Sequence, residues 1–441
     1  MAKETQSVRR LAHASLLAVE KHGRYSNIEI DSALKNADGI SDTDRALYTR
    51  LVYGVIERRL TLDHIIGKLS SRPLKDIDPG VLISLRLGLY QLIYTDRIPD
   101  FAAVSETVDT VPSRSKGFVN GVLRSFLRGG KKYSLPLGDS PEDLSVRYSV
   151  SPEICAIYTG SYGADVTKQI LESFFEPERI CLRVNTQRIS AAEAASRLPC
   201  CKPGTYMSDI LCVPSLDRTV REGIEGGLWF VQDEASRLCT VVLGAKAGEV
   251  IADVCSAPGG KSFSMAIDAE GRADIHSFDL HKNKLSLIKA SAERLGLACI
   301  AVEERDARHP KEELIGTCDR VLCDAPCSGL GVLGKKPDIR YKGGDCVGRL
   351  PEIQYGVLCG ASAYVKDGGV LVYSTCTLNR SENEDVVCRF LESHGEFSTV
   401  DFSVEPLSEG TSLKSENGML TLMPHLTGTD GFFVAKMIKN S

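Results

Sequence analysis

Hydrophobic residues recur at helical spacing over the first third of the chain. A leucine stripe runs from Leu82 to Leu92 at intervals of three or four residues, and the same period returns between Val119 and Leu127. Strand-like alternation is scarce here. The pattern predicts a helical bundle over residues 6–128, followed by a glycine- and lysine-rich linker at residues 129–134.

From about residue 228 the pattern changes to short apolar runs that alternate with amphipathic stretches. Phe230 to Ser236 opens this region, and strands are expected at residues 249–254, 275–279, 299–302, 321–323, 369–374 and 431–436. Such alternation is typical of a mostly parallel sheet in a doubly wound α/β domain. The stretch in between is mixed, with helices expected at 165–175 and 191–198 and a strand at 180–185. We therefore predict three domains, at residues 1–130, 140–225 and 226–441.

Composition and length fit this division. The chain has 441 residues, 43% hydrophobic and 25% charged, which is typical of a globular protein with two or three domains. No apolar run reaches the roughly 18 residues of a membrane span, and residues 1–6 lack the apolar core of a signal peptide. We expect a cytoplasmic protein. Its fifteen cysteines lack the spacing of a secreted disulfide framework, so we expect them to be reduced.

Charge is distributed unevenly along the chain. Residues 1–132 hold 21 Lys and Arg against 15 Asp and Glu, a local net charge of +6, whereas the whole chain has −5. A basic N-terminal domain on an acidic body is typical of a polyanion-binding module. On charge alone, a moderately basic solvated surface explains the count equally well.

Two predicted strands each deliver a cysteine at the carboxyl end. One strand runs into Asp324-Ala325-Pro326-Cys327 and the next into Ser374-Thr375-Cys376. Because ligands bind beyond the carboxyl ends of parallel strands, these residues predict one site with two thiols. A strand-end cysteine more often belongs to the core, and Cys323 should do so. Zinc held by Cys323 and Cys327 is disfavoured, because no second pair or histidine lies nearby.

A glycine turn and two acids predict a nucleoside site in the same domain. Gly259 and Gly260 follow the first strand and permit close approach of the backbone to a ligand. Asp279 ends the second strand, where its carboxylate can accept hydrogen bonds from both ribose hydroxyls. Asp306 follows the third strand. The glycines of this turn have neither the spacing of a dinucleotide-binding motif nor that of a phosphate-binding loop. S-adenosylmethionine therefore fits better than a phosphate-bearing ligand, although Asp279 alone is equally well explained as a helix cap.

Several motifs resemble a known family. The segments 85–92, 97–99 and 117–124 resemble the NusB-like RNA-binding domain of bacterial ribosomal RNA cytosine-5 methyltransferases, and Arg183-Val184-Asn185 resembles the signature that precedes their catalytic domain. Together with the two cysteine motifs, Asp253 to Lys261 resembles the RNA 5-methylcytosine methyltransferases of the Sun/RsmB type. The resemblance implies an all-α NusB-like domain, a small α+β RNA-contacting domain and a class I methyltransferase domain.

The family's site residues map onto this chain by motif. The resemblance implies that Cys376 attacks the base and Cys327 aids product release. It also implies that S-adenosylmethionine is bound by Cys255, Ser256, Ala257, Pro258, Gly259, Gly260, Lys261, Asp279, Asp306 and Asp324. A thiolate that adds to C6 of cytosine activates C5. Asp324, protonated through burial, is expected to donate to N3 of the base.

Two segments depart from the family pattern. Arg380 replaces a proline that presets a helix start, which should cost little. Residues 342–348 replace a more helical stretch and put the target nucleotide, rather than the chemistry, in doubt.

The sequence therefore predicts an enzyme that makes 5-methylcytosine in small-subunit ribosomal RNA. We expect a monomer without metal or membrane attachment. Methylation of transfer RNA and an inactive NusB-like assembly factor are the alternatives. DNA methylation is disfavoured, because those enzymes attack with the cysteine of the Pro-Cys motif.

Overall fold

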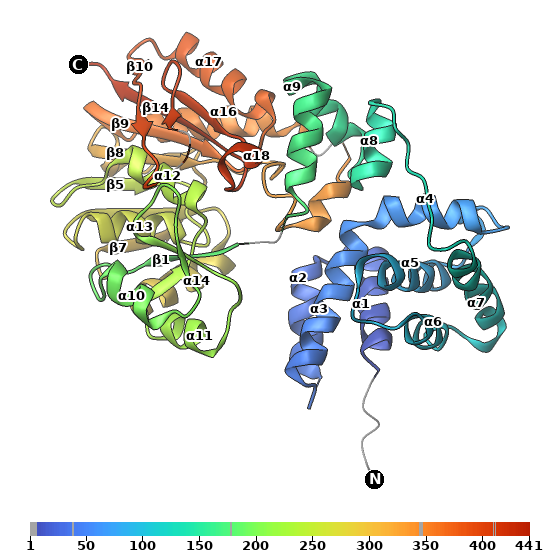
Figure 1. The fold of residues 1–441 in the computed structure, drawn as a ribbon. Coiled ribbons are helices and arrows are strands. Elements are labelled where there is room, and N and C mark those ends of the chain that lie inside the picture. Colours follow the sequence, from blue (N-terminus) through green and yellow to red (C-terminus); the bar gives the residue numbers. More distant parts are fainter. Residues whose placement is uncertain (1–6, 38, 177–178, 344–346, 409, 411) are drawn as a thin grey trace. The chain divides into compact units, whose positions relative to one another are not determined.

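The computed structural model describes residues 7–37, 39–176, 179–343, 347–408, 410 and 412–441 (Figure 1). The chain divides into two compact units. The first comprises Met1–Lys168 and Lys336–Gly343, and the second comprises Gln169–Lys335 and Gly344–Ser441. Within the described residues, no helix is long and apolar enough to cross a membrane. The three-domain division remains a prediction.

The first unit is built from helices, which confirms the predicted bundle. In chain order these are α1 (Val8–His22), α2 (Ser26–Asn36), α3 (Asp42–Glu57), α4 (Arg59–Leu69), the short η1 (Leu74–Asp76), α5 (Pro79–Tyr94), α6 (Asp100–Val108), α7 (Ser113–Arg128) and α8 (Pro141–Tyr148). Helix α9 (Pro152–Ser173), interrupted at Gly163, continues into the second unit.

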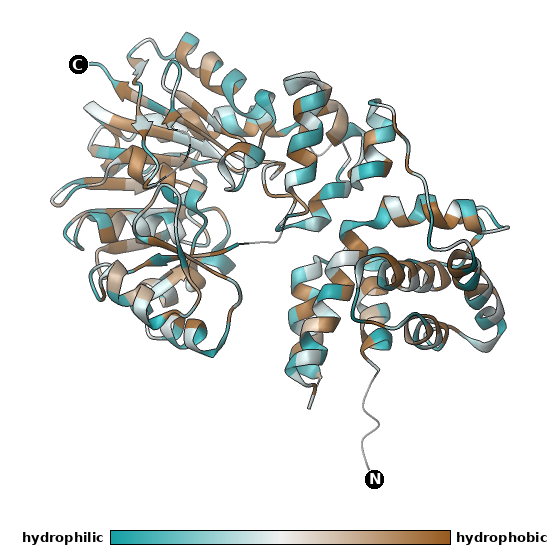
Figure 2. Ribbon diagram, in the orientation of Figure 1, coloured by the Kyte–Doolittle hydropathy of each residue, from teal (hydrophilic) through white to brown (hydrophobic). Residues whose placement is uncertain are grey.

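Helix α5 is the centre of the first unit. The Asp78 carboxylate accepts from the backbone N–H of Gly80 at 2.9 Å, and Pro79 provides the preset first residue. The helix is apolar on nearly every side (Figure 2) and contacts α1, α3, α4, α6 and α7. Its buried Arg86 is held by Asp63 at 2.6 Å and Glu20 at 2.7 Å, so the charge does not lie unpaired in the core.

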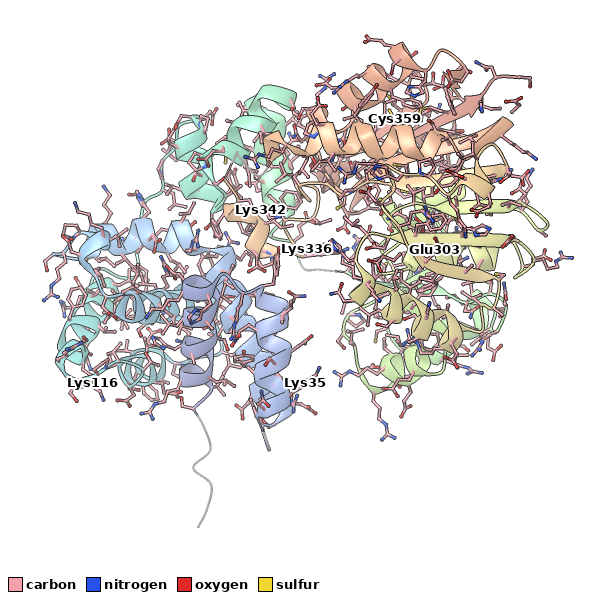
Figure 3. The ribbon with its side chains drawn as sticks, turned by 180° about the vertical axis from the view of Figure 1, so that it is seen from behind. Lys35, Lys116, Glu303, Lys336, Lys342 and Cys359 are labelled. Carbon is pink, nitrogen blue, oxygen red and sulfur yellow. The ribbon has the colours of Figure 1, made fainter. Side chains whose placement is uncertain are left out.

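A segment from late in the chain completes this unit. The short helix η3 (Pro337–Tyr341) places Asp338 at the start of α2, where it accepts from Ser26 Oγ at 2.6 Å. Figure 3 labels Lys336 and Lys342 at the two ends of the segment. Of the divergent stretch 342–348, residues 344–346 lie outside the described residues.

The second unit contains the predicted doubly wound sheet. Its strand order is β10-β14-β9-β8-β5-β6-β7, with β13 also paired to β14. The five strands from β9 to β7 are parallel, and the three remaining strands join antiparallel. The bounds are β5 (Val250–Asp253), β6 (Asp274–Asp279), β7 (Ile300–Glu304), β8 (Cys318–Asp324), β9 (Val365–Thr375), β10 (Phe397–Thr399), β13 (Met419–Leu422) and β14 (Phe432–Lys439).

Helices cover both faces of this sheet. Helices α12 (Glu234–Leu243), α13 (Gly260–Asp268) and α14 (Lys282–Leu295) pack on the face that contains Leu322, while α16 (Leu350–Ser362) and α17 (Glu384–Ser393) pack on the face that contains Cys323. Successive residues of a strand point to opposite faces of the sheet, so Leu322 and Cys323 lie in different hydrophobic cores. Cys323 is fully buried, as predicted. Figure 3 shows Cys359 on α16.

A smaller sheet with the order β2-β3-β1-β4 precedes the large one. Its elements are β1 (Ile180–Val184), α10 (Ala191–Arg197), β2 (Lys202–Pro203), β3 (Ile210–Val213), α11 (Arg218–Glu225) and β4 (Trp229–Val231). The expectation that Phe230 opens the doubly wound region is wrong, because β4 pairs with β1. Buried Arg183 ties this sheet to the layer of α13 through Asp268 at 3.1 Å.

Short elements complete the second unit. They are η2 (Glu312–Leu314), η4 (Arg380–Glu382), α18 (Pro424–Thr427) and the paired strands β11 (Ser403–Val404) and β12 (Leu413–Lys414).

A buried hydrogen-bond chain joins β5, α13 and β6 behind the carboxyl ends of the strands. Asp253 accepts from Ser262 Oγ at 2.6 Å, and Ser262 accepts from Ser277 Oγ at 2.7 Å. The other carboxylate oxygen of Asp253 has no hydrogen-bond partner among the described residues. Burial raises the pKa of Asp253 to about 7.

This pKa predicts a pH-dependent stability. The folded state retains a proton that the unfolded state loses near pH 4. The free energy of unfolding should therefore fall by at most about 1.4 kcal/mol per pH unit as the pH rises from about 4 to 7. Above pH 7 it should level off. Asp253→Asn should lack this component. Urea titrations from pH 5 to 8, followed by fluorescence of the single tryptophan, Trp229, measure it in the same unit. Parallel pH profiles of the two proteins would contradict the assignment.

Candidate active site

The site lies where the sheet reverses its winding direction. Strands β5 and β8 are neighbours, but the chain continues from β5 to β6 on one side and from β8 to β9 on the other. The crevice beyond such a point is where open α/β sheets bind ligands. An open pocket of about 1100 Å³, including its mouth, lies here. Seven predicted site residues line it: Cys255, Ala257, Asp279, Asp306, Asp324, Cys327 and Cys376.

The two predicted thiols meet in this pocket. Asp324 pairs with Ser374 in the parallel ladder of β8 and β9, so both loops leave the sheet at the same level. The sulfur atoms of Cys327 and Cys376 are 3.3 Å apart. The hydrogen bond with Cys376 and burial raise the pKa of Cys327 well above its usual range. Cys327 is therefore the member of the pair that keeps its proton.

A close backbone crossing fixes the loop of Cys327 against that of Cys376. The N–H of Gly331 donates to the carbonyl of Cys376 at 2.9 Å, and the carbonyl of Gly331 accepts from Gly431 N–H at 2.8 Å. A Cβ atom on Gly331 would lie 1.9 Å from the carbonyl oxygen of Gly431. Only glycine fits this crossing, which the local sequence did not reveal.

Lys261 forms an ion pair with Asp324 at the edge of the pocket. Its Nζ lies 2.7 Å from one carboxylate oxygen, and Ser374 Oγ donates to the other at 2.8 Å. Burial lowers the pKa of Lys261, but the Asp324 carboxylate outweighs it and the net shift is upward. Both donors stabilise the ionised form of Asp324. The expectation that burial keeps Asp324 protonated therefore disagrees with its contacts.

The sequence did not predict a buried polar network behind the two cysteine loops. Glu382, fully buried, accepts from the backbone N–H of Ser328 at 2.8 Å and from Gln354 Nε2 at 2.9 Å. Gln354 Nε2 also donates to the carbonyl of Pro326 at 2.9 Å. Glu382 thus links the loop of Cys327 to the short helix after Cys376. Its position just after the Thr-Cys motif was the available signal.

Arg380 is exposed and occupies the first residue of that short helix, η4. This is the position at which the family's proline would preset the backbone.

The remaining residues of the 255–261 turn shape the pocket from outside its lining. Ser256 Oγ donates to the carbonyl of Phe278 at 2.9 Å, which holds the turn on β6. Gly259 has a φ of 106°, and a Cβ there would lie 2.3 Å from the ring of Phe263. Pro258, Gly260 and Lys261 are likewise absent from the pocket wall. The turn therefore requires glycine at position 259 for its backbone conformation.

The two predicted ligand acids differ in their environments. The Asp279 oxygens accept from the backbone N–H groups of Ala257 at 3.1 Å and His281 at 2.9 Å, which orients the carboxylate. Asp306 is covered by Arg308, whose Nη2 lies 2.6 Å away. The hydrogen bonds from Arg308 lower the pKa of Asp306 to about 2. Asp279 keeps unused acceptor lone pairs toward the pocket.

An apolar wall also escaped the sequence analysis. Ile353 and Val357 of α16 line the pocket together with Leu280 and Ala307, which follow β6 and β7. Ile353 and Leu280 are partly exposed, as expected for a pocket that receives a flat apolar group. These positions carry no motif, so only the fold identifies them.

Comparison with known proteins agrees with this architecture. The family model described as 16S rRNA methyltransferase RsmB/F matches residues 240–438, and the NusB family model matches residues 6–128. The probable ribosomal RNA small subunit methyltransferase B of Bacillus subtilis is 37% identical over 98% of this chain and 99% of that protein. The ribosomal RNA small subunit methyltransferase B of Yersinia pestis is 32% identical over 99% of this chain and its own full length.

A solved structure shares the fold. A methyltransferase homolog protein from Pyrococcus horikoshii, 27% identical, superposes with a TM-score of 0.59 over 69% of this chain and 100% of that one. The resemblance found in the sequence is confirmed. With a NusB family domain followed by a methyltransferase domain, the chain belongs to the ribosomal RNA small subunit methyltransferase B family.

Proposed function

We propose that this enzyme transfers a methyl group from S-adenosylmethionine to C5 of a cytosine in small-subunit ribosomal RNA, through a covalent bond between Cys376 and the base. One observation carries the proposal. Two thiols lie 3.3 Å apart beside an ion pair, at the point where a doubly wound sheet binds ligands.

The pocket fits the methyl donor. Asp279 offers oriented acceptors for the ribose hydroxyls, and Ile353 and Val357 offer an apolar wall for the adenine. Cys255 and Ala257, from the same turn as the two glycines, line the pocket where the amino-acid end of the molecule would lie. When bound, S-adenosylmethionine supplies a methyl group on a positively charged sulfur, which is an electrophile.

Cys376 is the proposed nucleophile because Cys327 holds the proton of the pair. Its thiolate forms a bond with C6 of the cytosine, and C5 becomes electron-rich enough to accept a methyl group. Negative charge develops on the ring at N3 during this step. Asp324 lines the pocket and the Lys261 ammonium lies directly behind it, so we propose that stabilisation comes from this ion pair and not from a protonated Asp324.

Cys327 is proposed to complete the reaction. Its hydrogen bond with Cys376 is the largest cause of its raised pKa, and that bond is lost once Cys376 becomes a thioether. The pKa of Cys327 then falls, its proton is released to solvent through the open pocket, and the resulting thiolate removes the C5 proton. The C6–S bond breaks as the ring regains its double bond, which frees Cys376.

The assignment of ribosomal RNA rests on the helical unit and on the relatives. Two relatives that match nearly the whole chain are named for small-subunit ribosomal RNA. The N-terminal region carries a net charge of +6, which suits a polyanion. We propose that this unit binds the RNA while the sheet unit modifies the base.

Substitution of the two cysteines should separate attack from release. Cys376→Ala should abolish methyl transfer, because no thiolate remains to activate C5. Cys327→Ala should still attack and should accumulate a protein–RNA adduct, visible as a band of reduced mobility on a denaturing gel.

Cys388→Ala, which removes an exposed thiol of α17, serves as the matched control and should turn over normally. An adduct formed by Cys376→Ala but not by Cys327→Ala would reverse the roles. Absence of an adduct in both variants would refute the covalent route.

Asp279→Asn should weaken binding of S-adenosylmethionine. A hydrogen bond to a charged group contributes about 1.5–3 kcal/mol, so affinity should fall roughly 10- to 100-fold. Isothermal titration calorimetry on the full chain measures this directly. Asp274→Asn, at the opposite end of β6, is the control and should bind normally. Unchanged affinity in Asp279→Asn would remove this residue from the donor site.

A further inference from the structure

A second pair of cysteines lies in the small sheet, away from the proposed catalytic thiols. Cys181 on β1 and Cys212 on β3 are directly opposite each other in the antiparallel ladder. Their sulfur atoms are 2.8 Å apart, which is closer than the two catalytic candidates. Directly opposed residues on neighbouring strands have Cα atoms about 4.5–5.5 Å apart, which lies within the range that a disulfide spans.

Small molecules can reach this pair. Cys181 and Cys212 both line an open pocket of about 700 Å³ that is distinct from the one at the catalytic strand ends. Cys212 is partly exposed, whereas Cys181 is buried. Arg179 and Lys335 also line this pocket. The arrangement differs from that of Cys323, which is fully enclosed by the core.

The pair is suited to thiol oxidation rather than to metal binding. Among the residues that the structure describes, no group of three His, Cys, Asp or Glu side chains is placed to hold a metal ion. The hydrogen bond from Cys181 lowers the pKa of Cys212, and this outweighs the opposing effect of burial. The same hydrogen bond and burial raise the pKa of Cys181. Cys212 is therefore the member of the pair that gives up its proton more readily, and Cys181 lies in contact with it as a thiol.

We propose that Cys181 and Cys212 are a site of reversible oxidation, which a hydroperoxide converts into a disulfide. The Cys212 thiolate attacks one peroxide oxygen, the O–O bond breaks, and Cys212 becomes a sulfenic acid as the departing oxygen leaves as water or an alcohol. The sulfur of Cys181 then attacks the Cys212 sulfur, loses its proton and displaces water. Two thiols are oxidised by two electrons while the peroxide is reduced.

The disulfide would cross-link two strands of the small sheet. It joins residues 31 positions apart and closes a loop that contains α10 and β2. Strand β1 also carries Arg183, whose ion pairs reach Asp209 and Asp268. Oxidation would therefore hold β1 at the place where the small sheet meets the layer of α13. This site does not depend on the proposed methyl transfer.

Peptide mapping of the oxidised full chain tests the proposal. The protein is titrated with hydrogen peroxide, remaining thiols are blocked with N-ethylmaleimide, and non-reduced peptides are identified by mass spectrometry. A peptide that joins Cys181 to Cys212 should form at lower peroxide doses than those that oxidise Cys388, an exposed cysteine with no thiol partner described. Dithiothreitol should reverse it.

Thermal unfolding provides the second readout. Oxidation should raise the melting temperature of the second unit by roughly 5–10 °C, because the bond restricts the unfolded chain. Cys212→Ser and, separately, Cys181→Ala should lose both the linked peptide and the shift, whereas Cys376→Ala should retain both. The proposal would be overturned if Cys181 and Cys212 were still free to react with N-ethylmaleimide at peroxide doses that oxidise Cys388. A linked peptide formed only by Cys327 and Cys376 would overturn it as well.

Discussion

The parallel pairing of β8 with both β5 and β9 is the constraint on which the site depends. It brings three strand ends to one level, with Asp324 opposite Ser374 and the glycine turn of β5 alongside. Cys327 and Cys376 are 49 positions apart in the chain and meet only because of this ladder. The crossing at Gly331 and the carboxylate of Glu382 then hold the two loops in place. The chemistry therefore rests on backbone hydrogen bonds of the sheet.

Neighbouring strands bring thiols into contact twice in this chain, but in different surroundings. Cys327 and Cys376 lie beside the ion pair of Lys261 and Asp324, which supplies a positive charge for a developing anion. Cys181 and Cys212 lie in another pocket, where Lys335 is paired with two carboxylates, Asp233 and Asp430. Proximity of two thiols alone therefore does not define a catalytic site. The charged groups around each pair decide which chemistry it can support.

The sequence predicted the features that local patterns encode. The helical bundle, the parallel strands and the buried position of Cys323 follow from hydrophobic periodicity, and the residues at the strand ends follow from motifs. The sequence did not predict the features that depend on contacts between residues far apart in the chain. Strand β4 joins the small sheet through β1, and Lys261 forms its ion pair with Asp324 from 63 positions away. The expectation that burial keeps Asp324 protonated disagrees with the structure, because Asp324 is only partly buried and its partner Lys261 was not visible from either motif. The apolar wall of α16 likewise carries no local signal.

We propose that Cys376 at this strand end modifies a cytosine of small-subunit ribosomal RNA. Bisulfite sequencing of ribosomal and transfer RNA tests it most directly, in cells that lack the gene and are complemented with the wild-type chain or with Cys376→Ala. We predict one protected cytosine in small-subunit ribosomal RNA that returns with the wild-type chain and stays absent with the variant. Protection that persists without the gene, that Cys376→Ala restores, or that appears only in transfer RNA would contradict the claim.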